Sequence, residues 1–298
     1  MQEHQRTTKI VWIVLLNGVI TLAEFVGGIF SGSLSLISDA FHNLGDTLAI
    51  TLSYIAQKIA SKQRDPKKTY GYQRSEILSA FVNSMVLVVL SLILALEAIK
   101  RFFDSEKIDS KLMLIVAVIG LVANLLSVLL LKKDTDKNLN LKSSYLHLLS
   151  DTLSSISVIV GALLIKQFGI YWIDPMITLL VSIYIFIEAV GVIKKTIDIL
   201  MQSAPVLDYQ RLKKEIESLS GVKTIHHIHI WQYSDTSVVF DAHIDFADCL
   251  LSEIEKAYPL ITDILKKNYG ITHVTIQAET NAKDQKKLIL RNQDEISS

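Results

Sequence analysis

Residues 38–46 read Ser-Asp-Ala-Phe-His-Asn-Leu-Gly-Asp and lie inside a long apolar segment, from about Leu34 to Ile59. Four polar members of this stretch recur at positions i, i+3, i+4 and i+7, so they share one face of an α-helix. They are Asp39, His42, Asn43 and Asp46. An aspartate at the centre of a membrane helix costs roughly 2.5–3.5 kcal/mol, whereas each large apolar residue returns only about 0.3–0.6 kcal/mol. We therefore expect this helix to be stable in a bilayer only if its polar face meets protein, water or a bound cation.

A second polar turn opens another apolar segment, where His147 and Asp151 repeat the spacing and order of His42 and Asp46. Each pair is one helical turn apart, so both side chains of a pair point the same way. Two such helices face to face offer two imidazoles and two carboxylates, a set suited to tetrahedral Zn²⁺, whose charge the carboxylates balance. Such groups can also simply pack in a bundle or line a wet cavity. Paired ionisable motifs in two apolar helices favour an ion site.

The composition is that of a membrane protein. The chain has 298 residues, of which 50% are hydrophobic, and its mean hydropathy is +0.37. Its formal net charge is zero, so the charge balance does not indicate a nucleic-acid partner. Cys249 is the only cysteine, which excludes an intramolecular disulfide and a thiolate cluster. The first apolar segment is long enough to span and has no small-residue cleavage site, so we predict no cleaved signal peptide.

Six apolar segments approach the length that a bilayer requires, and we predict that each is a transmembrane helix. They cover about 10–30, 34–59, 77–99, 112–131, 145–165 and 174–197. Basic residues concentrate in the N-terminal tail and in the second-to-third and fourth-to-fifth loops, which places both termini in the cytoplasm. The basic residues between Lys100 and Lys111 weaken this bias, but an even number of spans keeps the termini on one side. We expect a multi-pass protein of the cytoplasmic (plasma) membrane, embedded in the lipid bilayer.

Polar residues in the other spans could line a hydrated path or join helices by hydrogen bonds. We favour helix packing for Asn17, Asn83 and Asn124, whereas Glu24 fits either role because it is ionisable. The third span is almost wholly apolar and suits a position that faces lipid or a second copy of the chain.

The composition changes after Ile199, and Pro205 closes a short linker to a predicted soluble domain. We predict a helix at 208–220, strands at 225–231 and 237–246, a helix at 252–268 and a strand at 272–279. The order αββαβ indicates a small α+β sheet domain. We therefore divide the chain into a transmembrane transport domain at 1–204, a cytosolic domain at 205–280 and a disordered tail at 281–298.

Five of the eight histidines fall in this soluble domain. Strand alternation places His243 opposite the apolar face of its strand, and it places His273 and Glu279 on the polar face of the last strand. Such a face could hold a second metal ion, or it could be a solvated surface with incidental histidines. The alternation of side chains along the first strand favours His227 and His229 over His226 and does not settle which of them is the ligand from that strand.

Two further stretches have simple structural interpretations. We interpret the basic run Lys62–Lys68 as a solvated cytoplasmic face, and we assign Trp231 and Tyr233 to packing or an interface.

These motifs together resemble the cation diffusion facilitator family over residues 10–280. The likeness is carried by the paired H-x-x-x-D motifs, by Tyr70-Gly71-Tyr72-Gln73-Arg74-Ser75-Glu76, by H-x-x-H-I-W from His226 and by H-V-T-I-Q from His273. The resemblance implies a homodimeric, proton-coupled Zn²⁺ exporter with a ferredoxin-like cytosolic domain, which also binds zinc. The transport site that it implies comprises His42, Asp46, His147 and Asp151. The cytosolic site that it implies comprises His226, His243 and Glu279, with His273 as a further candidate and Gln277 where some members have histidine.

The chain departs from the family pattern in two loops. Gln73 stands where many relatives have histidine, which puts an additional metal site in that loop in doubt. The loop Lys132–Ser144 lacks the histidine-rich run of many zinc transporters, so metal capture before transport could differ.

We expect an antiporter that exchanges zinc, and also cadmium or cobalt, for protons by alternating access. Imidazole and carboxylate ligands must lose their protons to bind a metal ion, so metal loading releases protons. One alternative is an intramembrane metalloenzyme, but four matched ligands leave no open position and the chain has no H-E-x-x-H motif. We therefore expect no enzyme. A second alternative, a membrane zinc sensor that moves no ion, stays open at this point.

Overall fold

The computed structural model describes residues 2–104, 106–132, 139–280 and 288–289. Within its helices, the side chains of residues 2–16, 127, 130–132, 139–148 and 150 lie outside this description, as does most of the predicted tail at 281–298. The chain divides into two compact units. The first comprises Met1–Ala56 and Ser79–Ile193, and the second comprises Gln57–Leu78 and Lys194–Ser298.

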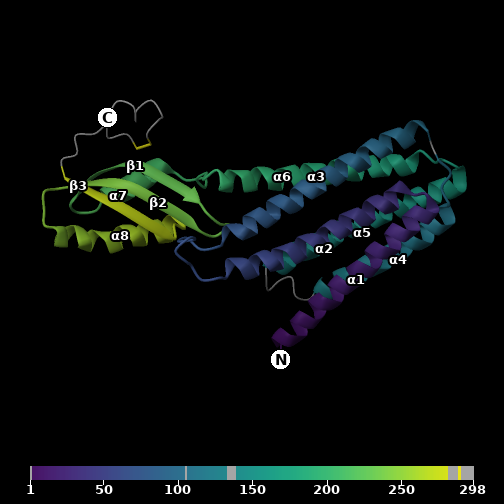
Figure 1. Cartoon of the computed structure of the whole chain (residues 1–298), viewed down its shortest axis with the longest axis horizontal. Helices are drawn as coiled ribbons and strands as arrows, with labels where there is room; N and C mark the ends of the chain where they lie inside the picture. Colours follow the sequence, from purple (N-terminus) through teal and green to yellow (C-terminus); the bar gives the residue numbers. More distant parts are fainter. Residues whose placement is uncertain (1, 105, 133–138, 281–287, 290–298) are drawn as a thin grey trace. The chain divides into compact units, whose positions relative to one another are not determined.

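Six long helices overlap the six predicted spans and lie side by side (Figure 1). They are α1 (Gln2–Ser31), α2 (Leu34–Ala60), α3 (Arg74–Phe103), α4 (Ser110–Lys132), α5 (Leu139–Phe168) and α6 (Ile173–Leu200). Among the described residues, three helical stretches are long and apolar enough to cross a membrane: Arg74–Phe103, Asp151–Phe168 and Ile173–Leu200. Shorter apolar stretches cover Asn17–Ser31 of α1 and Ser110–Leu126 of α4. The helix α2 is absent from this set because its polar face lowers its mean hydropathy.

Buried polar contacts join the helices of the first unit. Asn124 of α4 donates a hydrogen bond to Ser155 of α5 at 3.2 Å, which confirms the predicted packing role of Asn124. Close approach of α1 and α4 depends on Gly27, since a Cβ atom there would lie 2.6 Å from Val116 Cγ2. An apolar cluster around the fully buried Met113 contains residues of α2, α4, α5 and α6 and packs these helices together.

Asp174 anchors the start of α6 to the start of α2. Its carboxylate accepts hydrogen bonds from Ser33 Oγ at 2.7 Å, from Leu34 N at 2.7 Å and from Ser35 Oγ at 2.6 Å. Asp174 is fully buried. A carboxylate at this position satisfies amide groups that the first turn of a helix leaves unpaired, and it interacts favourably with the positive end of the helix dipole. One side chain therefore fixes where α2 begins.

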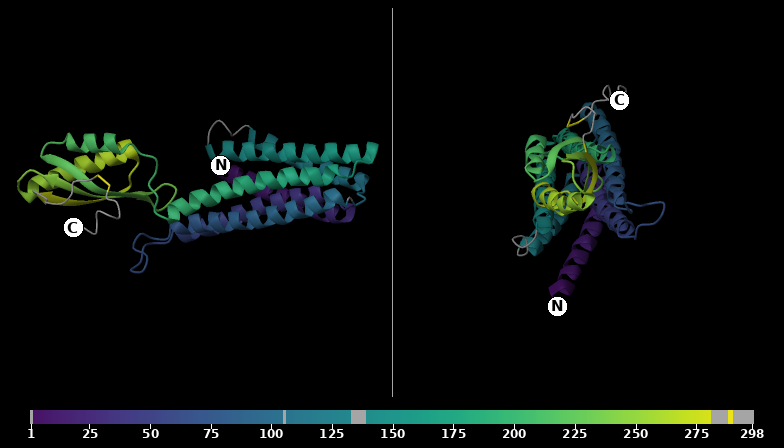
Figure 2. Two further views of the ribbon diagram at one scale, coloured as in Figure 1. Left: turned by 90° about the horizontal axis from the view of Figure 1, so that it is seen from above. Right: turned by 90° about the vertical axis from the view of Figure 1, so that its left-hand side faces the viewer.

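The second unit contains a three-stranded sheet covered on one face by two helices (Figures 1 and 2). Its elements are α7 (Tyr209–Glu217), β1 (Val222–Gln232), β2 (Val238–Phe246), α8 (Leu251–Tyr269) and β3 (His273–Thr280). The predicted order of helices and strands is confirmed. The strands lie in the order β1-β2-β3, with β1 antiparallel and β3 parallel to β2. The parallel pair requires a crossover, which α8 supplies.

Alternation along β2 builds the core of this unit. Phe240, Ala242, Ile244 and Phe246 point to one face and are almost fully buried against residues of α7 and α8. The side chain of Asp208 begins α7 by accepting hydrogen bonds from two backbone amides of its first turn. The opposite face of the sheet is left for polar side chains, and the histidines lie there.

Candidate metal centres

The first candidate centre lies in the membrane unit, where α2 and α5 bring three ionisable side chains together. His42 Nε2 lies 3.8 Å from Asp46 Oδ2 and 3.4 Å from Asp151 Oδ1. One ligand atom from each of the three residues lies within 4.8 Å of the others. The structure thus groups three of the four predicted ligands. His147 lies one turn before Asp151 on α5, but its side chain is outside the described part of the chain.

A cavity of about 600 Å³ opens beside this group, between α2, α3, α5 and α6. His42 and Asp46 have side chains that are 17% and 19% exposed, whereas Asp151 is buried. The remaining polar lining includes Asn83 and Glu188. The centre is therefore in the wall of a cavity that an ion can enter, which is the environment that an ionisable group in a membrane helix requires.

Asp39 and Asn43, the other two members of the polar face predicted for α2, have a different role. Ser154 Oγ of α5 donates to Asp39 Oδ1 at 2.9 Å, and Asn43 Nδ2 donates to Glu24 Oε2 of α1 at 2.8 Å. At 3.6 residues per turn, the pair Asp39 and Asn43 is rotated about 60° from the pair His42 and Asp46. The polar face of α2 is thus two adjacent stripes. One stripe faces the cavity and the other joins α2 to its neighbouring helices.

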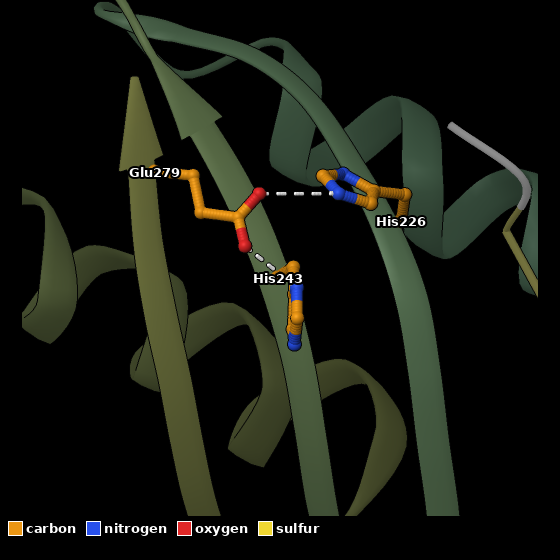
Figure 3. A group of neighbouring side chains, drawn as sticks. All are labelled: His226, His243 and Glu279. Atoms are coloured by element: carbon orange, nitrogen blue, oxygen red, sulfur yellow. Dashed lines mark ion pairs between the residues drawn. The ribbon is translucent and has the colours of Figure 1, made fainter. Parts of the chain in front are cut away.

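The second candidate centre lies on the open face of the sheet and takes one residue from each strand (Figure 3). The carboxylate of Glu279 lies between two imidazoles, with Oε1 2.7 Å from His243 Nδ1 and Oε2 3.3 Å from His226 Nε2. Gln277 Nε2 also donates to Glu279 Oε1, at 2.9 Å. Gln277 therefore contacts the carboxylate of the group, although an amide in that position adds no third imidazole.

The atoms of this group fit a metal ion. His226 is buried, and both of its ring nitrogens, together with Glu279 Oε2, lack a well-directed hydrogen bond to any residue that the structure describes. Unsatisfied buried polar atoms are costly unless a water or an ion completes them. Two imidazoles and a carboxylate form the donor set of many zinc sites. The geometry therefore supports His226, His243 and Glu279 as candidate ligands.

A bulge in β1 explains which histidine of that strand joins the group. His226 pairs with His243 and His229 pairs with Asp241, so β1 has one residue more than β2 in this interval. His227 takes up the extra length with a positive φ of 52°. Because the bulge reverses the alternation, His226 faces the group and the parity argument for the later histidines is wrong here.

His273 is not part of this group. It begins β3, six residues before Glu279, and it pairs in register with Val239. Its ring instead contacts Tyr70, with centroids 5.6 Å apart. Gln73, the residue that placed a loop metal site in doubt, accepts a hydrogen bond from Ser237 Oγ at 3.1 Å.

Asp174 was not predicted from the sequence as a structural residue and marked only the start of a span. An acidic residue in the first turn of an otherwise apolar helix is a signal that could have identified it. The hydrogen-bond partners of Asp174 lie 139 to 141 residues away along the chain, so local sequence patterns could not identify them.

Comparison with known proteins agrees with this architecture. Residues 10–201 match the family described as "Cation efflux transmembrane domain", and residues 204–281 match "Cation efflux protein, cytoplasmic domain". The chain belongs to the cation efflux, or cation diffusion facilitator, family. The resemblance inferred from the motifs is thereby confirmed, and the family description is that of transporters rather than enzymes.

Individual relatives in the cation efflux family cover nearly the whole chain. A "Cadmium, cobalt and zinc/H(+)-K(+) antiporter" of Bacillus subtilis is 37% identical over 93% of this chain and 90% of its own length. The "Metal cation efflux system protein CzcD" of Cupriavidus metallidurans is 35% identical over 93% of this chain and 87% of its own. The "Zinc transporter ZitB" of Escherichia coli is 33% identical over 94% of this chain and 89% of its own.

Proposed function

We propose that the chain is a proton-coupled exporter that carries Zn²⁺, and also Cd²⁺ or Co²⁺, out of the cytoplasm. The observation that carries this proposal is the group of His42, Asp46 and Asp151 in the wall of a cavity between membrane helices. The names of the relatives, which include an antiporter of cadmium, cobalt and zinc and a zinc transporter, support the same substrates. A zinc sensor that moves no ion is not favoured by any of these names.

The proposed transport site comprises the three grouped residues and His147. Two carboxylates and two neutral imidazoles around Zn²⁺ have a formal charge of zero, so the loaded site can stay in a medium of low dielectric constant. The same atoms bind protons when the metal leaves, because a metal and a proton compete for one lone pair. The metal ion and protons are therefore exchanged at a single site that becomes accessible from each side of the membrane in turn.

We further propose six transmembrane helices with both termini in the cytoplasm. Six helices of suitable length and the distribution of basic residues support this arrangement. The family match to a cytoplasmic domain at 204–281 supports this side for the second unit, and the loop Gln57–Leu78 belongs to the same unit. The domains proposed are accordingly 1–204 in the membrane, 205–280 in the cytosol and a tail at 281–298.

The cytosolic domain is proposed to be ferredoxin-like, to bind zinc and to dimerise. Its αββαβ order and its group of His226, His243 and Glu279 support the fold and the metal site. When bound there, zinc would link all three strands and neutralise the carboxylate. Homodimer assembly is supported by the family to which the domain belongs.

The test is uptake of zinc by proteoliposomes under an imposed pH gradient. The parent protein is expected to take up Zn²⁺ only when a proton gradient is present. Asp46→Ala and Asp151→Ala should abolish this flux, because each leaves a divalent ion with one carboxylate in a buried site. Ser157→Ala, also on the cavity wall, is the matched control and should retain flux. Zinc binding without any flux in the parent would show a sensor instead of an exporter.

A further inference from the structure

A second cavity lies within the unit formed by Gln57–Leu78 and Lys194–Ser298, and no residue of either candidate metal centre lines it. Its volume is about 450 Å³. The loop between α2 and α3 forms much of its lining, and the start of α3, the end of β1 with the residue after it, and Gln202 after α6 contribute the rest. The basic run in this loop was interpreted as a solvated surface, but part of it faces this cavity.

The loop has a defined conformation. Asp65 Oδ1 accepts hydrogen bonds from the backbone amides of Lys67 and Lys68, each at 2.8 Å, and the Tyr72 hydroxyl donates to the other carboxylate oxygen. The Tyr72 hydroxyl first, and then these amides, lower the pKa of Asp65 below its ordinary value. Gly71, with φ of +84°, allows the chain to turn back towards α3. The walls of the cavity are therefore set by a folded turn.

The loop also contacts the sheet domain. The ring of Tyr70 lies edge-on to Tyr233 with centroids 5.6 Å apart, and Gln73 accepts the hydrogen bond from Ser237. Tyr233 is buried. Because loop and sheet belong to one compact unit, the lining residues are held together by tertiary contacts as well as by the local turn.

The charge of the lining is positive. Lys67, Lys68 and Arg74 line the cavity, whereas none of its lining residues is acidic. Asp65 partly offsets the charge of Lys68. Within the described chain, Lys67 and Arg74 have no ion-pair partner, and Arg74 is half-buried. A half-buried guanidinium beside an ammonium group favours an anion and disfavours a divalent cation.

Gln202 lines the same cavity under backbone strain. It has φ of +61° directly after α6, at the helix end where glycine is usual. A side chain is unfavourable in this conformation, and the exposed Gln202 is one of the lining residues. A strained residue in the wall of a cavity motivates a hypothesis of function for that cavity. An amide in the same lining as the basic residues can hydrogen-bond to the ester oxygens or hydroxyls of an anionic ligand.

The cavity adjoins the first turn of α3, one of the helices long and apolar enough to cross a membrane. Arg74 is the first residue of α3, a helix apolar enough to cross a bilayer, and Leu78 lines the cavity one turn later with an exposed side chain. Basic residues at the cytoplasmic end of a span attract anionic lipids, and tyrosine and tryptophan favour this interface. Trp231 and three tyrosines supply such rings in the lining.

We propose that this cavity binds the phosphate-containing headgroup of an anionic phospholipid, with Arg74 and Lys67 as the charged contacts. A volume of about 450 Å³ is far larger than a single inorganic anion requires and suits a glycerophosphate headgroup. The aromatic rings and Leu78 cover the part of the ligand that continues into the bilayer.

The test uses the full-length protein purified in neutral detergent and titrated in native mass spectrometry. The probes are phosphatidylglycerol, phosphatidylcholine with the same acyl chains, and inorganic phosphate. The cavity variant is Lys67→Gln with Arg74→Gln. The control variant is Lys58→Gln with Lys62→Gln, which removes the same charge from the same segment at exposed positions outside the lining.

One phosphatidylglycerol per chain is expected to bind in preference to phosphatidylcholine. The cavity variant should lose at least about tenfold in affinity for it, and the control less than about twofold. Gln202→Gly serves as a second variant, because glycine suits the positive φ and keeps the fold. It should weaken lipid binding by about threefold to tenfold. Equal losses in the cavity and control variants, no preference between the lipids, or equally tight binding of inorganic phosphate would each overturn the proposal.

Discussion

Replacing Glu279 with glutamine removes one charge from the cytosolic centre while keeping its shape. Glu279 contacts both histidines of the group, at 2.7 and 3.3 Å. In the metal-free domain the change should cost little, because Glu279 Oε2 is buried without a directed hydrogen bond within the described residues. A neutral amide removes a buried charge there and keeps an oxygen atom that can lie beside His243 Nδ1. The loss should appear only when zinc is added.

The expected loss of zinc-dependent stabilisation follows from the linkage between metal binding and folding. Removing a group that supports a ligand typically weakens metal affinity 10- to 100-fold, so removing a candidate ligand should cost at least about 100-fold. At a free zinc concentration of about 100 Kd, the parent domain gains about 2.7 kcal/mol, whereas a site weakened 100-fold gains only about 0.4 kcal/mol. For a domain of this size, that difference lowers the zinc-dependent rise in Tm by about 10 °C or more.

The assay is thermal unfolding of the full-length protein with a chelator and with zinc. It is run in a background that carries Asp46→Ala and Asp151→Ala, so that the proposed transport site does not contribute. Glu255→Gln, an exposed position on α8, makes the same charge change away from the centre and should leave the zinc response unchanged. A full zinc response in the Glu279→Gln protein would refute the assignment of this group as a metal site.

Four other outcomes are expected. His42→Asp gives three carboxylates and one imidazole at the proposed site, so initial rates should show less preference for Zn²⁺ over Cd²⁺ or Mn²⁺; an unchanged metal ranking would remove His42 from selectivity. Asp174→Ala leaves buried donors unpaired and should lower the free energy of unfolding by about 2–5 kcal/mol, so an unchanged Tm would contradict its anchoring role. The pKa of Asp65 is lowered in the folded loop, so the ionised carboxylate stabilises the turn. This stabilisation is present above the ordinary pKa of an aspartate and is lost as the pH falls through the pKa of the folded state. Tyr72→Phe should therefore speed tryptic cleavage of this loop at neutral pH, while equal cleavage in parent and variant would count against the turn. Residues 205–298 alone should form a zinc-dependent dimer, which sedimentation with and without chelator would detect or exclude.

Helical periodicity was enough to predict much of the membrane centre. His42 and Asp46 are four residues apart, which on a helix places them on one face whatever the rest of the fold does. The repeat of that spacing at Asp151 then identified the facing helix. Regular local geometry made both inferences possible.

The features that the sequence did not reveal depend on irregular or distant contacts. The bulge at His227 reverses strand alternation without a glycine to mark it, so parity alone could not identify His226 as the histidine of β1 that joins the group. The loop Gln57–Leu78 follows a membrane helix in sequence, yet it belongs to the compact unit that contains the sheet. Hydropathy divides a chain by composition, whereas such a loop is assigned by contacts with residues more than a hundred positions away.

The hydrogen bonds between Asp174 and the residues at the start of α2 fix that end of the helix, so a tilt of α2 would pivot there. At 1.5 Å per residue, His42 lies about 12 Å from the fixed point at Leu34, and Ala56 lies about 33 Å from it. A tilt of about 10° would move His42 by about 2 Å and Ala56 by about 6 Å. Metal–ligand distances tolerate deviations of only about 0.2 Å, so this tilt is enough to separate His42 from Asp151 on the neighbouring helix. The same small rotation would therefore open the group of His42, Asp46 and Asp151 and move the far end of α2 about three times as far as His42.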